Sequence, residues 1–168
     1  MKSLFVTFLF SLFLFPKSFA QKTEAIHISG DILTEKVFSI AQIKGFPSSD
    51  LGDFEITNHL GEPRGVAKQL KGFSVLRLLE QIELDAPSPK LLSEYYLIFE
   101  ASDGYKVVFS WNELFNNSLG EQVYLITSKD GESLEKMEDG ILLISKTDIR
   151  TGRRHVKNLA RIRINRVD

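Results

Sequence analysis

Short apolar segments, each closed by a turn signal, recur along most of this chain and constrain its fold more than any other feature. Ile162 and Ile164 alternate with arginines near the C-terminus, and such period-two alternation is typical of a strand with one buried face. The unbroken apolar run 141–144 indicates a strand that is buried on both faces. The Asp103-Gly104 pair is a hairpin signal. We therefore expect strands over residues 24–29, 54–58, 95–100, 105–109, 122–127, 141–144 and 160–167.

Three short helices are expected between these strands. A serine, which is a good N-cap residue, precedes each of the segments 40–44, 75–82 and 111–115. The second segment carries apolar residues at three- and four-residue spacing, as an amphipathic helix does, and Trp111 and Phe115 of the third are expected in the core. Glycines and a proline at 61–65 predict a turn or loop. The fold class is α+β, a strand-rich mixed fold with short inserted helices.

The first 20 residues have the three-part layout of a secretory signal peptide. Met1 and Lys2 are followed by an apolar run over 4–15 and by small residues at 18 and 20. The alternative is a membrane anchor, but the run is shorter than the roughly 20 residues that a spanning helix needs. We expect cleavage after Ala20, a single domain over 21–168, and a periplasmic or secreted protein with no membrane span after cleavage.

The chain contains no cysteine, and its formal net charge is −1. The absence of cysteine excludes disulfides, thiolate zinc sites, iron–sulfur ligation and a cysteine nucleophile. A near-neutral charge argues against a general nucleic-acid-binding protein. The core must therefore be held together by packing alone, and we expect the domain to fold without metal.

An ordered series of motifs along the chain resembles a known family. Residues 38–47 read F-S-I-A-Q-I-K-G-F-P and are similar to F-S-L-x-x-L-x-x-x-P, and residues 102–110 read S-D-G-Y-K-V-V-F-S and are similar to A-D-G-Y-x-x-x-F-S. Residues 71–79 (K-G-F-S-V-L-R-L-L) and 154–162 (R-H-V-K-N-L-A-R-I) match two further motifs. Together they resemble the sulfite-oxidase-type molybdopterin-binding domain in its small exported bacterial form.

The resemblance implies a mixed fold that cradles a pterin cofactor in a polar pocket. In complete enzymes of the family, a cysteine thiolate binds molybdenum on the loop between the strand like 54–58 and the helix starting near Ser74. This chain has no cysteine there, and a histidine or asparagine cannot copy thiolate ligation of a soft metal. The G-P-L-R-L stretch of the family is also changed, because Ile141 replaces its proline. Molybdopterin is thus the cofactor that the resemblance implies, while the lack of cysteine weighs against redox catalysis.

A basic run near the C-terminus, residues 150–157, is the main candidate site for a ligand. Arginine forks suit phosphate, carboxylate or sulfate groups, and the family places this region beside the pterin phosphate. The alternative is a solvated basic loop. If the run binds an anion, replacing Arg154 by alanine should weaken binding and leave the fold nearly as stable. The candidate ligand-binding residues in this run are Arg150, Arg153, Arg154 and His155.

A second group of candidates corresponds to the family's metal-bearing loop: His59, Arg64 and Lys68. We expect His59 to face the basic run across one polar pocket, and Tyr105 of the hairpin to line that pocket; the alternatives are an idle loop histidine and ordinary turn chemistry. The three histidines of the chain have no metal-ligand spacing, so no metal site is predicted.

These observations predict an exported, non-catalytic molybdopterin-binding-type domain that holds an anionic ligand, such as a pterin phosphate, in a basic pocket. Two alternatives stay open. One is a molybdenum oxidoreductase with a non-thiolate metal ligand, and the other is a scaffold that retains only the fold and contacts another exported protein.

Overall fold

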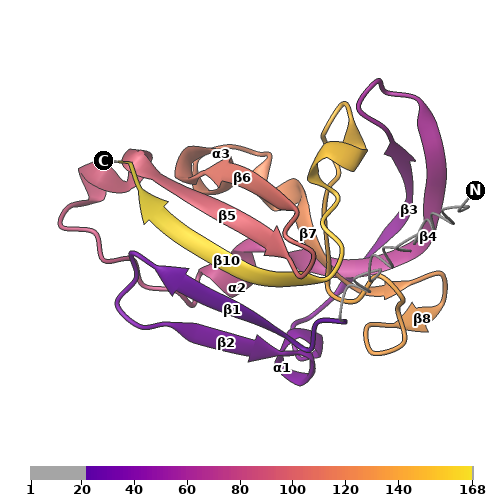
Figure 1. Cartoon of the computed structure of the whole chain (residues 1–168), viewed down its shortest axis with the longest axis horizontal. Helices are drawn as coiled ribbons and strands as arrows, with labels where there is room; N and C mark the ends of the chain where they lie inside the picture. The colour runs from indigo at the N-terminus through magenta and orange to yellow at the C-terminus, as the bar shows by residue number, and fades with distance from the viewer. Residues whose placement is uncertain (1–21, 168) are drawn as a thin grey trace, which may run out of the picture.

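The computed structural model describes residues 22–167, so the predicted signal peptide lies outside the described residues. Two five-stranded sheets form the framework of the described chain (Figure 1). The first sheet has the order β2-β1-β10-β5-β6, in which β1 pairs with β10 in parallel and every other pair is antiparallel. Its strands are β1 (Ala25–Gly30), β2 (Lys36–Ser39), β5 (Tyr95–Ala101), β6 (Lys106–Ser110) and β10 (Leu159–Arg166).

The second sheet is antiparallel. Its order is β3-β4-β7-β8, and its fifth strand, β9, also pairs with β7. Its strands are β3 (Ser49–Thr57), β4 (Pro63–Ser74), β7 (Val123–Lys129), β8 (Glu132–Ser133) and β9 (Leu142–Ser145). One cluster of buried apolar side chains joins both sheets, including Phe99 and Phe109 of the first and Phe73 and Leu125 of the second. The strand-rich α+β class expected from the sequence is confirmed.

Helices are short and sit between strands, as predicted. They are α1 (Ile40–Lys44), α2 (Leu76–Leu79), α3 (Trp111–Phe115) and the 3-10 turns η1 (Pro89–Glu94), η2 (Gly120–Gln122) and η3 (Thr151–Arg154). Ser39 and Ser110 cap α1 and α3 through complete capping boxes, which confirms both predicted helices. No helix within residues 22–167 is long and apolar enough to cross a membrane.

Two segments differ from the sequence-based expectation. The helix expected over 75–82 is only the single turn α2, because the Ile82 N–H bonds to the Leu79 carbonyl and the chain then bridges through Leu84 to Ile32. The turn or loop expected at 61–65 is a tight turn, but it lies earlier, over 58–62, and residues 63–65 already belong to the 12-residue strand β4. The apolar residues after α2 therefore pack as part of a loop and do not form one face of a helix.

Candidate functional site

The basic run lies on η3 and its flanks, between β9 and β10. Thr151 fixes η3 to the end of β3: its hydroxyl donates to the Glu55 carbonyl (2.7 Å), and its N–H donates to the Thr57 hydroxyl (3.0 Å). A side chain at Gly152 would meet the Thr57 carbonyl oxygen at 2.1 Å, so this close approach requires glycine. The run is therefore anchored to the second sheet through Thr151 and through the close approach at Gly152.

Arg154 is held inside the fold by two carboxylates. Its Nε and Nη2 donate to Asp148 at 2.7 and 2.6 Å, and its Nη1 donates to Glu113 at 3.2 Å. The guanidinium carbon also lies 4.3 Å from the centre of the Phe109 ring. Hydrogen bonding to Asp148 raises the pKa of Arg154, against the opposing effect of burial. The expectation that Arg154 lines the polar pocket and adds little to stability is therefore revised.

His155 and Tyr105 do meet at one pocket. A cavity of about 250 Å³ is lined by Ala101, Asp103, Tyr105, His155 and Lys157, between the β5–β6 turn and the residues after η3. The Tyr105 hydroxyl donates to the Arg153 carbonyl oxygen at 2.6 Å and so joins the turn to η3. The structure thus brings two of the eight candidate residues together at this cavity.

The His155 imidazole is kept neutral and lacks a protein partner at one nitrogen. Burial, with smaller contributions from the charges of Lys157 and Lys129, lowers the pKa of His155 to about 4. Its Nε2 is buried and makes no hydrogen bond within residues 22–167. Buried polar atoms are nearly always bonded, so this nitrogen calls for a partner such as a water molecule or a ligand.

Lys157, which stood in the basic run but outside the candidate set, shares a carboxylate with a second lysine. Its ammonium lies 2.7 Å from Asp139, which also pairs with Lys129. Burial is the largest influence on Asp139 and raises its pKa, but the hydrogen bonds and charges of the two lysines together bring that pKa below its ordinary value. Lys157 could have been chosen from the basic run, whereas the role of Asp139 depends on a spatial contact that no spacing reveals.

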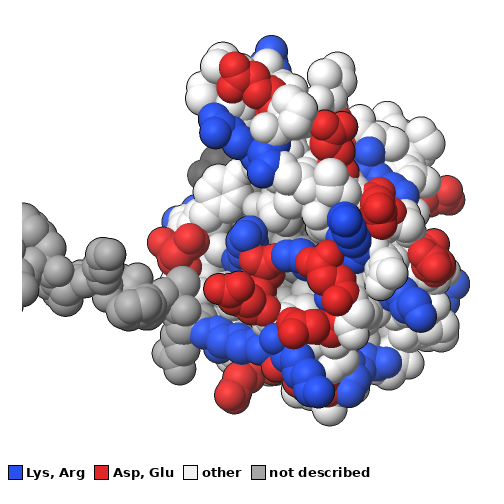
Figure 2. All heavy atoms as spheres, turned by 90° about the vertical axis from the view of Figure 1, so that its right-hand side faces the viewer, with Lys and Arg blue, Asp and Glu red and all other residues white. Residues whose placement is uncertain are grey.

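The other candidates lie outside this cavity. His59 is exposed in the turn between β3 and β4, Arg64 and Lys68 are exposed on β4, and Arg64 lies 3.9 Å from Glu62. Arg150 and Arg153 are exposed and form no ion pair among the described residues. Figure 2 shows acidic and basic side chains interspersed over the face it draws, with no continuous patch of one sign. His59, which was expected to face the basic run across one pocket, is not among the residues that line this cavity.

The residues present do not fit the metal end of a molybdenum cofactor. The chain has no cysteine to supply a thiolate, and no three of the described His, Asp and Glu side chains gather in a group that could hold a metal ion. The cavity beside His155 is smaller than the roughly 300–1,000 Å³ of pockets that bury drug-sized ligands. Arg150 and Arg153 remain as exposed cations that could pair with a phosphate.

The fold and the site define a strand-rich α+β domain with the sulfite-oxidase-like fold that the motifs resemble. Among solved structures, the chain is similar to the sulfane dehydrogenase SoxCD from Paracoccus pantotrophus, with a TM-score of 0.58 and 16% identity. That likeness covers 84% of this chain and 38% of the other, so this chain spans well under half of the enzyme's length. No protein-family model matches the sequence, and no curated protein matches it.

Proposed function

We propose that this protein is an exported binding domain that uses a sulfite-oxidase-like scaffold without redox catalysis, and that it binds a small oxyanion in the His155 pocket. Two observations about one residue carry the proposal: His155 lines this cavity, and its buried Nε2 has no hydrogen-bond partner among the described residues. In the tautomer that carries its proton on Nε2, the imidazole donates a hydrogen bond to an anion oxygen.

Groups next to His155 favour the binding of an anion in this cavity. The Lys157 ammonium lines the same cavity, and its charge is shared with Asp139. The one carboxylate in the lining, Asp103, is turned toward its own backbone, where its Oδ1 accepts from the Tyr105 N–H at 2.9 Å. The volume of about 250 Å³ suits a sulfate- or phosphate-sized anion better than a whole pterin.

The test is an NMR titration of the His155 ring with sulfate and with phosphate. Without anion the ring should titrate near pH 4. Bound anion should raise that pKa, because it favours the charged imidazolium. In a titration that follows the backbone amide signals of residues 101–105 instead of the ring, His155→Phe should weaken binding roughly 10- to 100-fold, as expected for loss of a hydrogen bond to a charged group. Arg64→Gln, on the β3–β4 hairpin, is the matched control and should bind as the wild type does.

Unchanged ring resonances at tens of millimolar of both anions would refute the proposed site. Molybdenum analysis of protein purified from its native host tests the alternative of a redox enzyme. We expect no bound molybdenum, because the chain offers no thiolate ligand.

A further inference from the structure

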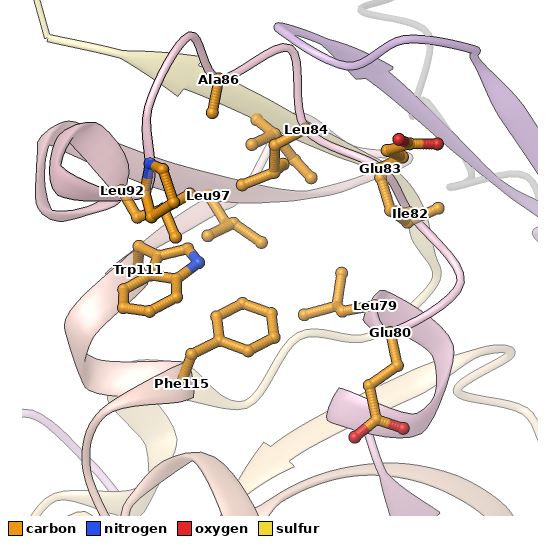
Figure 3. A pocket seen from close by; sticks show the side chains of 12 residues that line it. Leu79, Glu80, Ile82, Glu83, Leu84, Ala86, Leu92, Leu97, Trp111 and Phe115 are labelled. Carbon is orange, nitrogen blue, oxygen red and sulfur yellow. The ribbon is translucent and has the colours of Figure 1, made fainter.

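A second cavity, lined by apolar side chains, lies where α2, the loop after it, η1 and α3 meet (Figure 3). Its volume is about 420 Å³, within the range of pockets that hold small organic ligands. Leu79, Leu84 and Leu97 face its centre from one side, and Trp111 and Phe115 close the other (Figure 3). Leu79 and Leu97 belong to the buried core and Trp111 packs against it, so the pocket opens at the edge of the core.

The two aromatic rings provide a flat binding surface. Trp111 and Phe115 stack with ring centroids 5.3 Å apart and an interplanar angle of 21°. Phe115 is 37% exposed, although it was expected in the core. An apolar body placed on these rings would cover this exposed surface, which is the usual source of affinity in such pockets.

Two carboxylates lie at the margin of the pocket. Glu80 and Glu83 are exposed and line the cavity from opposite margins, with their carboxylates turned outward (Figure 3). They form no ion pair among residues 22–167. No lysine or arginine lines the cavity. The charge of this site is therefore negative, opposite to the charge of an anion-binding site, and its nearby aromatic faces also favour a cation.

We propose that this pocket binds a small organic cation, with an aromatic or branched aliphatic body against Trp111 and Phe115 and a protonated amine at the margin, where the exposed side chain of Glu80 or of Glu83 turns toward it. This inference is independent of the oxyanion site, because the two cavities share no lining residue. It assigns the domain a second ligand of the opposite charge.

Trp111 is the only tryptophan of the chain, so its fluorescence reports on this pocket directly. The probes are phenylbutylammonium, the neutral phenylbutanol and the anionic phenylbutanoate, which share one apolar body. We expect a saturable fluorescence change, with the ammonium bound most tightly and the carboxylate least. The double variant Glu80→Gln/Glu83→Gln should weaken ammonium binding about 2- to 20-fold, since exposed ion pairs are individually weak, and should leave phenylbutanol binding unchanged.

Two further variants complete the experiment. Ala86→Phe, which fills the pocket from its loop, should abolish binding of all three probes; Leu92→Trp is the substitute if that variant melts below the wild type. Glu132→Gln, an exposed change on β8, is the matched control and should bind as the wild type does. Equal affinity for all three probes would overturn the cation assignment. So would ammonium binding that is as tight in the Glu80→Gln/Glu83→Gln variant as in the wild type. No saturable change with any probe would overturn the pocket itself.

Discussion

Replacing Arg154 by alanine tests whether this arginine stabilises the fold or only presents a charge. The Asp148 side chain is 9% exposed and that of Arg154 is 20% exposed, so this pair is largely removed from water. Arg154→Ala would leave the Asp148 carboxylate buried with one remaining donor, the Ser145 hydroxyl at 2.8 Å. Removing one partner of a buried pair costs about 3–5 kcal/mol in the free energy of unfolding.

That loss should lower the melting temperature by roughly 6–20 °C, since a domain of this size loses about 2–4 °C for each kcal/mol. The measurement is a thermal melt followed by circular dichroism, supported by urea unfolding. Arg153→Ala is the matched control: Arg153 is the exposed neighbour, and its loss should change stability by less than about 0.5 kcal/mol.

A double variant separates the ion pair from the lost packing against Phe109. Asp148→Asn/Arg154→Ala removes both charges and retains an acceptor for Ser145. We expect it to be more stable than the sum of the two single losses predicts, because contacting charges are coupled. If Arg154→Ala melts within 2 °C of Arg153→Ala, by the same scale of about 2–4 °C for each kcal/mol, then Asp148 does not need its counter-ion and the reasoning is refuted.

Three other predictions concern pH, metal and backbone packing. The lowered pKa of His155 means that the unfolded chain binds more protons between pH 6.5 and about 4, so stability should fall by about 2 kcal/mol between pH 7 and 4.5; urea unfolding at both pH values should show this loss in the wild type and a smaller loss in His155→Gln. Thermal melts with and without a strong chelator should coincide, and a large drop on chelation would reveal a structural metal. Gly152→Ala should cost about 1–3 kcal/mol, because its Cβ would overlap the Thr57 carbonyl oxygen; an unchanged melting temperature would show that η3 shifts freely.

Elements with local signals could be predicted from the sequence. The helices α1 and α3 begin after Ser39 and Ser110, whose hydroxyls accept from the backbone three residues on, and Gln42 and Glu113 complete the capping boxes. Around the predicted hairpin, β5 alternates buried with half-buried residues, and β6 alternates exposed with buried ones. In each case the residues that specify the structure are close in sequence, so a pattern can reveal them.

The β3–β4 hairpin could not be predicted in the same way. Its outer half, 61–66, is exposed throughout, so no apolar alternation marks the start of β4. Strand pairing across the turn and the contact with η3 through Thr151 hold it instead. As a result, the region that the resemblance identified with a metal-bearing loop is a turn and a strand, and its three candidate residues project from a hairpin instead of lining a pocket.

The basic run shows why a count of charges along the chain overestimates anion binding. Arg154 is neutralised by Asp148 and Glu113, and Lys157 is paired with Asp139, which it shares with Lys129. These partners are recognisable only once the chain has folded. His155 is neutral near pH 7 because it is buried. The pocket therefore retains little net positive charge, and a bound anion must be recognised mainly by hydrogen bonds. Anion affinity should then depend strongly on the His155 imidazole and only weakly on ionic strength, because screening acts on exposed charges much more than on short, buried hydrogen bonds.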